Sequence, residues 1–299
     1  DGREGLGVLM SLRFLLAASL LFGATAYATA YAADLPAVST EDLPPRSIPA
    51  APDTPPVPAW VHTHLRVGHL PGTGRMAAEF LKAGYDVVTV NALRKWDIVG
   101  PSASLYPKEE VEAADRYLRQ HVEACHAVGA RAVFYIGPVQ TFAFCPEFVK
   151  AHPDWMRIRP DGKPDAAPNF ANIRSGYADW LLAQLAHLTR EYKADGYWFD
   201  GYAPVHLHSY DETTRRLFRE HSGGKDLPRP PEDHPERLPV FDPVNDPLAR
   251  EYLAWHHQHF VDFAARMRAV VRKENPEAVI YVNHSANRTW YYPDMYMGE

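Results

Sequence analysis

The sequence predicts an α/β protein of the (β/α)₈ TIM-barrel class that stops after about six βα units. Two observations support this class. From Trp60 onward, an amphipathic helix, a glycine or polar stop and a short strand follow one another repeatedly, as they do in parallel βαβ units. The first strand is followed by neither GxGxxG nor GxxxxGK with Ser or Thr, the phosphate-binding motifs common in the rival open, doubly wound sheet.

Each element follows from a local pattern. Gly84 and Gly129 close two of the helices, and Pro276 ends the last long one. Apolar residues recur at spacings of three and four, as in 177–192, which is typical of a helix packed on one side. The expected strands are 61–67, 87–91, 133–136, 197–200, 279–283 and 295–297. Because a full barrel takes about 250 residues or more, six units indicate a chain that is incomplete at its carboxyl end.

The first residues carry processing signals rather than fold. Residues 1–9 precede Met10 and are interpreted as upstream translation that is not native to the protein. Residues 10–32 have the charge, the apolar run and the small-residue site of a signal peptide, with cleavage near Ala32. The apolar run is too short to span a bilayer comfortably. We therefore expect a secreted or periplasmic protein without stable membrane insertion after cleavage.

A proline-rich linker is expected at 33–58. It holds eight prolines and few large apolar side chains, so it cannot bury enough surface to fold. The catalytic domain is therefore expected at 59–299. That domain contains Cys125 and Cys145. Export permits a disulfide, but Cys125 also lies on the apolar face of a helix, and a buried free thiol fits the pattern as well.

Charge and composition argue against nucleic acid as a partner. The formal net charge is -6, and no basic stripe with interleaved aromatic side chains is present. The aromatic content of 12% is high, which suits core packing and also suits stacking on sugar rings.

Polar residues follow the expected strands, at the carboxyl ends where barrel enzymes place their chemistry. These residues are His62 and His64 on strand one, Asn91 on strand two, Asp200 on strand four, Asn283 and His284 on strand five, and Glu299 beyond strand six. A purely structural barrel does not need such a ring of hydrogen-bonding groups.

Asp200 lies in the stretch ADGYWFDGY, which leads a carboxylate out of an apolar strand directly into glycine. Side chains alternate along a strand, so Trp198 and Asp200 share the face that lines the barrel. Tyr197 and Phe199 share the opposite face, under the helices. Gly201 lets the backbone turn without crowding the carboxylate. This placement suits a nucleophile or an electrostatic stabiliser, although strand-end aspartates also commonly cap helices or pair with arginine.

Other residues near the expected mouth are candidate substrate contacts. Trp198 supplies an aromatic wall, Tyr202 lies where it could stack on a sugar, and His206 could reach over the carboxylate. Asp195 precedes the strand and is expected to be structural. The run HHQH at 256–259 is expected on the solvated surface of a helix.

The segments HPDWMRIRPDGKP (152–164) and YADWLLAQLAHLTREYKADGYWFDGY (177–202) resemble the hypothetical glycosyl hydrolases that form TIM barrels related to α-L-fucosidases. The stretches RRLFREHSGGKDLP and YLAWHHQHFVDFAARMRAVVRKENPEAVIYVNHS resemble the same family. The resemblance therefore covers roughly 60–299. Those fucosidases carry a WFDG stretch whose aspartate is the nucleophile, and WFDG stands here at 198–201.

The resemblance implies an α-L-fucosidase-like glycosidase that acts on a carbohydrate with retention, uses Asp200 as nucleophile and needs no cofactor. A retaining enzyme needs a second carboxyl about 5–5.5 Å from the first, and Glu299, the last residue, is the candidate acid/base. The expected substrate contacts are His62, His64, Asn91, Trp198, Tyr202, His206, Asn283 and His284. The stretch WVHTHLRVGHL departs from the fucosidase pattern for strand one, which leaves the sugar open.

Two other functions stay open at this point. His62 and His64, two residues apart on one strand, could share a metal as in metal-dependent amidohydrolases, with His284 in support. Strand four would then have to supply a lysine or histidine ligand, but it supplies Asp200. Neutral imidazoles can equally donate to and accept from sugar hydroxyls, and we expect no metal. The other function is that of a barrel that binds glycan without cleaving it.

Overall fold

Six parallel strands form one sheet in the computed structural model, which describes residues 57–62, 67–68, 77–90, 95–137, 146–164, 170–200, 202, 208–229, 245–283 and 295–297. The strands are β1 (Val67–Gly68), β2 (Val87–Val90), β3 (Arg131–Ile136), β4 (Gly196–Phe199), β5 (Val279–Asn283) and β6 (Met295–Met297). The α-helices are α2 (Ala77–Lys82), α3 (Lys108–Ala127), α4 (Pro146–Ala151), α5 (Gly176–Tyr192), α6 (Glu212–Ser222) and α7 (Pro247–Glu274). Three short 3₁₀ helices are η2 (Ala59–His62), η4 (Gly100–Leu105) and η6 (Pro153–Trp155).

The strands lie in the order β1-β2-β3-β4-β5-β6, and each of the five pairings is parallel. A doubly wound sheet reverses its strand order at a switch point, and this sheet does not. Sequential order is that of a barrel built strand by strand. The described strands form an open sheet with β1 and β6 at its edges, so the prediction of βαβ units is confirmed while closure into a barrel stays a prediction.

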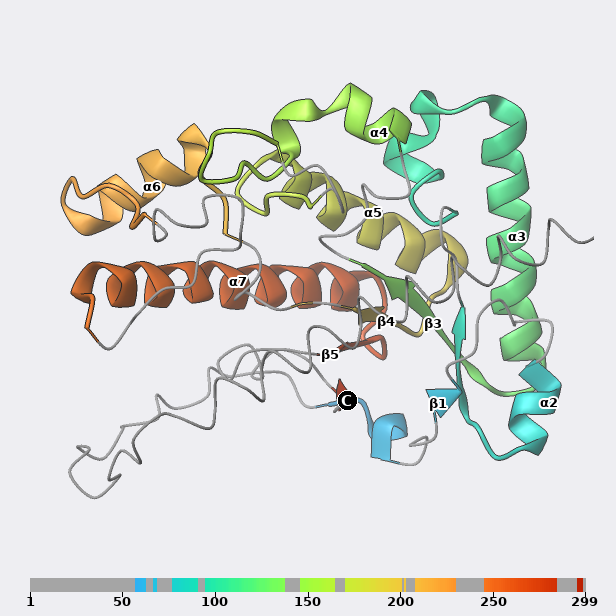
Figure 1. The fold of residues 1–299 in the computed structure, drawn as a ribbon. Coiled ribbons are helices and arrows are strands. Elements are labelled where there is room, and N and C mark those ends of the chain that lie inside the picture. Colours follow the sequence, from blue (N-terminus) through green and yellow to red (C-terminus); the bar gives the residue numbers. More distant parts are fainter. Residues whose placement is uncertain are drawn as a thin grey trace, which may run out of the picture. The chain divides into compact units, whose positions relative to one another are not determined.

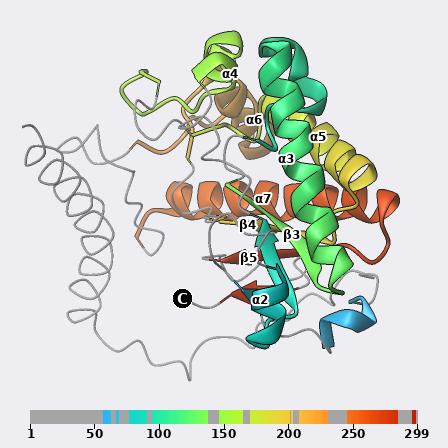
Figure 2. The ribbon, with the colours of Figure 1, turned by 90° about the vertical axis from the view of Figure 1, so that its right-hand side faces the viewer.

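Side chains on both faces of the sheet are buried, as is typical of parallel sheets. One face carries Phe134, Tyr197 and Phe199, which are fully buried under the helices. Helices α3, α5 and α7 pack over this face (Figures 1 and 2). The opposite face carries Val133 and Trp198, which are buried in a separate cluster. The alternation of the WFDG strand is therefore as predicted, with Tyr197 and Phe199 on one face and Trp198 on the other.

Short polar side chains fix where the later helices begin. Asp211 accepts a hydrogen bond from the Thr214 backbone N–H at 3.0 Å and starts α6. Asp246 accepts one from the Leu248 N–H at 2.8 Å and starts α7. Each satisfies an N–H group that the first turn of a helix leaves unpaired. Helix α6 then lies along the first half of α7, beyond the strands of the sheet (Figure 1).

The predicted bounds of strand one, 61–67, are wrong. Residues 59–62 form the 3₁₀ helix η2, and β1 begins only at Val67. Trp60 donates its indole N–H to the Glu277 carbonyl, next to the start of β5, at 2.7 Å. The Arg131 guanidinium, at the start of β3, lies 5.1 Å from the Trp60 ring centroid. Trp60 and the neighbouring Val61, the first residue of the predicted strand, thus pack at the amino-terminal end of the sheet.

The corrected bounds also remove His62 from the first strand. It ends η2, before the first strand, at the end of the sheet opposite to the carboxyl ends of the strands. His64 also precedes Val67 in the chain, and it lies outside the described residues. The metal-dependent alternative requires His62 and His64 to lie on one strand. The structure contradicts this for His62, which lies in η2.

Asp195 has the structural role that the sequence suggests. Its buried carboxylate accepts hydrogen bonds from the His126 ring at 2.7 Å, from the Arg131 guanidinium at 2.9 Å and from the Ala132 N–H at 2.8 Å. Burial alone would raise the pKa of this carboxyl, but these three donors outweigh burial and hold the pKa below its usual value. The following Gly196 is a glycine because a Cβ there would lie 2.6 Å from the Val279 carbonyl oxygen of β5.

The His126–Asp195 pair predicts a modest pH dependence of stability. The hydrogen bond to Asp195 raises the pKa of His126, so this stabilisation is fully present below pH 6.5 and is lost as the pH rises through the folded-state pKa. His126 is 39% exposed, so the pair contributes about 0.5–1 kcal/mol. The difference in unfolding free energy between wild type and His126→Gln, measured in urea, should shrink between about pH 6 and about pH 9. A difference that grows over this range would contradict the pairing.

Cys125 lies on the inner side of α3 with no exposed surface. Burial, and secondarily the nearby Asp195 charge, raises the pKa of its thiol to about 12. It forms no disulfide within the described part of the chain, and Cys145 lies outside that part.

The predicted upstream residues, the signal peptide and most of the linker lie outside the described residues and stay predictions. Among the helices that are described, none combines the length and the apolar character needed to cross a bilayer.

Candidate active site

Asp200 lies at the carboxyl end of the sheet, immediately after β4. Its backbone N–H donates to the Ile136 carbonyl of β3 at 3.0 Å, so the ladder between the two strands extends to this residue. The Tyr135 hydroxyl, also on β3, donates a hydrogen bond to Asp200 Oδ2. The Asp200 residue is partly exposed. A carboxylate is thus held in place from the neighbouring strand while it retains access to solvent.

The strand register brings Asn283 to the same edge. Phe199 pairs with Val282, so the next residues along, Asp200 and Asn283, lie side by side on adjacent strands. Asn283 pairs in turn with Met297, the last residue of β6. The backbones of these two predicted polar positions therefore lie at one edge of the sheet.

A layer of aromatic side chains supports Asp200 from below. Tyr135, Trp198 and Tyr281 are directly paired across β3, β4 and β5. The centroids of the Tyr135 and Trp198 rings are 4.5 Å apart, and the Trp198 and Tyr281 rings stack at 5.9 Å with an interplanar angle of 9°. The Tyr281 hydroxyl lies 3.4 Å from Thr89 Oγ1 on β2. The layer therefore crosses four strands.

Trp198 belongs to that buried layer and does not form an exposed aromatic surface for a substrate. It is 4% exposed, so it forms the floor under Asp200 and offers no free face for a sugar to stack on. Its predicted role as a substrate contact is corrected to a supporting one, because neighbouring strands cover both sides of the ring.

Tyr202 is also a core residue. It has no exposed surface, its ring packs edge-on against Phe260 at 5.4 Å, and its hydroxyl donates to the Phe260 carbonyl at 2.6 Å. The prediction that Tyr202 stacks on a sugar at the mouth is wrong, since α7 covers the ring.

The histidine run at 256–259 is not uniformly solvated. His256 is fully buried, and its Nδ1 accepts a hydrogen bond from Arg174 Nη2 at 2.9 Å. The Arg174 guanidinium lies 4.5 Å from the Trp255 ring centroid, and burial lowers its pKa to about 10. Helix α6 covers this part of α7 through Phe218, whose ring meets Trp255 at 5.2 Å. His256 itself packs against His208 and Phe260. Contacts from distant segments thus bury a helix face that looks polar in the sequence.

Five of the predicted site residues lie outside the described part of the chain. They are His64, Asn91, His206, His284 and Glu299. Within the described ranges, no group of three or more histidine, cysteine, aspartate and glutamate side chains is placed to hold a metal ion.

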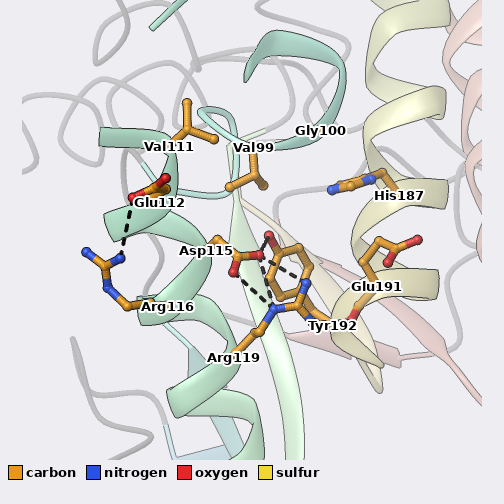
Figure 3. Close-up of a pocket in the computed structure, with 10 residues that line it drawn as sticks. All are labelled: Val99, Gly100, Val111, Glu112, Asp115, Arg116, Arg119, His187, Glu191 and Tyr192. Carbon is orange, nitrogen blue, oxygen red and sulfur yellow. Dashed lines mark hydrogen bonds and ion pairs between the residues drawn. The ribbon is translucent and has the colours of Figure 1, made fainter. Parts of the chain in front are cut away.

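A groove of about 350 Å³ lies away from the strand ends, between α3 and α5 (Figure 3). Asp115 on its wall accepts hydrogen bonds from Arg119 at 3.1 Å and from the Tyr192 hydroxyl at 2.8 Å. Burial would raise the pKa of Asp115, but these two donors lower it below its usual value. The Arg119 guanidinium also donates to the Glu191 carbonyl at 3.1 Å. Asp115 and Arg119 are thus paired with each other, and their hydrogen bonds to Tyr192 and Glu191 link the two helices.

Tyr135 is the site residue that sequence reasoning missed. It lies 65 positions before Asp200. Alternation along the strand does carry a signal, because Tyr135 shares the inward face with Val133, one layer below the strand end.

Comparisons with known proteins find similar structures among glycoside hydrolases. No protein-family model matches the sequence, and no curated protein matches it. An α-L-fucosidase isoenzyme 2 from Paenibacillus thiaminolyticus has a similar structure, with a TM-score of 0.50 and 17% identity over 73% of this chain and 32% of its own. A β-galactosidase from Marinomonas ef1 has a TM-score of 0.55 and 13% identity over 76% of this chain and 38% of its own.

A third neighbour is a β-galactosidase from the haloarchaeon Halorubrum lacusprofundi, with a TM-score of 0.54 and 14% identity over 78% of this chain and 40% of its own. The chain therefore spans between about a third and two fifths of these structures. At such identities the likeness concerns the fold, which is distantly glycosidase-like.

Proposed function

We propose that this protein is an exported glycoside hydrolase of the (β/α)₈ class that cleaves glycosidic bonds with retention, through Asp200 as nucleophile. The observation that carries the proposal is the position of the Asp200 carboxylate. It is partly exposed at the carboxyl end of β4, it is held by Tyr135, and an aromatic layer supports it. Barrel enzymes place catalytic groups at this end of the strands, and glycosidase-like folds are the structural neighbours.

The proposed reaction has two steps. In the first, a bond forms between an Asp200 oxygen and the anomeric carbon, the bond from that carbon to the leaving oxygen breaks, and the leaving oxygen takes a proton from an acid. In the second, water attacks the same carbon while giving a proton back to that group, and Asp200 departs as a carboxylate. We assign the acid/base role to Glu299, two residues after Met297 of β6.

The substrate is proposed to be an oligosaccharide or polysaccharide. The names of the structural neighbours, an α-L-fucosidase and two β-galactosidases, indicate which sugars to try first. A sugar ring at this edge would meet Asp200 and Asn283 from adjacent strands. Amide groups can both donate to and accept from sugar hydroxyls, so we assign Asn283 to substrate binding, along with His206 and His284.

An assay of the full-length gene product against a panel of aryl glycosides tests the proposal. The panel includes α-L-fucoside and both anomers of galactoside, each with and without EDTA. We expect turnover of at least one glycoside that is unchanged by EDTA. Turnover that EDTA abolishes would support a metal-dependent hydrolase, and affinity for glycan without any turnover would support a binding protein.

A further inference from the structure

We propose that Tyr135 is the positioning residue of the nucleophile: its hydroxyl holds Oδ2 of Asp200, which directs Oδ1 to the anomeric carbon and assists the departure of the carboxylate in the second step. This inference rests on the proposed function of Asp200. The direct observation is the hydrogen bond that Tyr135 donates to Asp200 Oδ2.

The Tyr135 hydroxyl is itself fixed in position. Tyr135 pairs with Trp198 in the register between β3 and β4, and their ring centroids are 4.5 Å apart. Trp198 in turn stacks on Tyr281. The ring of Tyr135 is thus held by regular strands and packed neighbours, and residues held in this way keep a catalytic group within the narrow geometry that reaction requires.

The two steps of the proposed reaction need this hydroxyl differently. In the first step Asp200 loses negative charge as its bond to the sugar forms, so a hydrogen bond to the carboxylate gives orientation but little acceleration. In the second step the negative charge returns to the carboxylate as the sugar leaves. A fixed donor aimed at the oxygen where charge develops lowers the barrier of that step.

Kinetics of Tyr135→Phe separate these roles, because phenylalanine keeps the ring and its packing on Trp198 and removes only the hydroxyl. With an aryl glycoside that has a good leaving group, we expect kcat to fall by about 10- to 100-fold, the range for a hydrogen bond to a charged group. KM should fall in parallel, and a burst of aryl alcohol equal to the enzyme concentration should precede the steady state, because the covalent intermediate accumulates.

Tyr281→Phe is the matched control. Tyr281 lies in the same layer and is also a strand tyrosine, more deeply buried than Tyr135, and its hydroxyl faces Thr89 instead of Asp200. We expect its kcat and KM to stay within about twofold of wild type, without a burst. Unchanged kinetics in Tyr135→Phe, or equal losses in both variants, would overturn the proposal.

A measurement without substrate distinguishes failure of this inference from failure of the proposed function. The Tyr135 hydroxyl proton, bonded to a carboxylate, should give a proton NMR resonance in slow exchange with water. That resonance should disappear in Tyr135→Phe and shift or disappear in Asp200→Ala, but persist in Tyr281→Phe. If it behaves in this way while no glycoside is cleaved, the contact stands and the glycosidase assignment fails. If the resonance is unchanged in Asp200→Ala, the inference itself is wrong.

Discussion

Asp200→Asn is expected to lower turnover of the best glycoside by about 10⁴-fold or more, the range seen when a nucleophile is removed. The substitution keeps the shape of the side chain and its ability to accept a hydrogen bond from Tyr135. It removes the negative charge that attacks the anomeric carbon. Binding of the substrate and the unfolding midpoint in urea should therefore change little, and steady-state kinetics together with urea denaturation check both expectations.

Chemical rescue sharpens this prediction. In Asp200→Ala the space of the carboxylate is vacated, and added azide should restore cleavage of an activated aryl glycoside. The product should be a glycosyl azide of the opposite anomeric configuration, since azide attacks from the side where Asp200 stands. Asp161→Asn is a suitable control, because Asp161 is a carboxylate in a turn that pairs with Arg159. Activity that persists in Asp200→Asn at near wild-type level would contradict the nucleophile assignment.

Tyr202→Ala is expected to lower the free energy of unfolding by about 3–5 kcal/mol, the range for truncating a buried aromatic side chain. The residue has no exposed surface, and it packs against Phe260 of α7. Tyr202→Phe keeps the ring and loses only the hydrogen bond to the Phe260 carbonyl, which should cost about 1 kcal/mol. Urea denaturation measures both values.

The Tyr202 pair of variants also separates core packing from sugar binding. A residue that packs in the core should leave KM unchanged in Tyr202→Phe, with kcat per folded enzyme also unchanged. If both variants are as stable as wild type and KM rises tenfold or more, Tyr202 contacts the sugar at the mouth of the barrel. That result would contradict the packing described above.

The sheet was largely predictable because short apolar runs between glycine or polar stops fix strands locally. The bounds of β5 and β6 match the prediction, and those of β2, β3 and β4 differ by at most two residues. The prediction of strand one was wrong because Trp60 and Val61 are apolar for a different reason: they pack at the amino-terminal end of the sheet, where Trp60 contacts Glu277 and Arg131. Such contacts, more than 60 positions away, leave no local pattern.

The candidate site was predictable only in part, for a related reason. The position of Asp200 at the end of its strand follows from alternation along that strand, and the register places its backbone beside that of Asn283. The burial of Tyr202 depends on its packing against α7, and that of His256 depends on Arg174 and His208. The partner of Asp200, Tyr135, comes from another strand. Pairings between distant segments of this kind are set by tertiary structure, which single-sequence patterns do not contain.

Covalent trapping tests the central claim most directly. The full-length protein would be incubated with an activated 2-deoxy-2-fluoro glycoside of the sugar that the panel identifies, and the labelled protein would be digested and sequenced by mass spectrometry. We predict one sugar per protein molecule, attached to Asp200 in the peptide that contains 194–202. A label on a different carboxylate, or turnover with inversion and no label, would contradict the assignment of Asp200 as nucleophile.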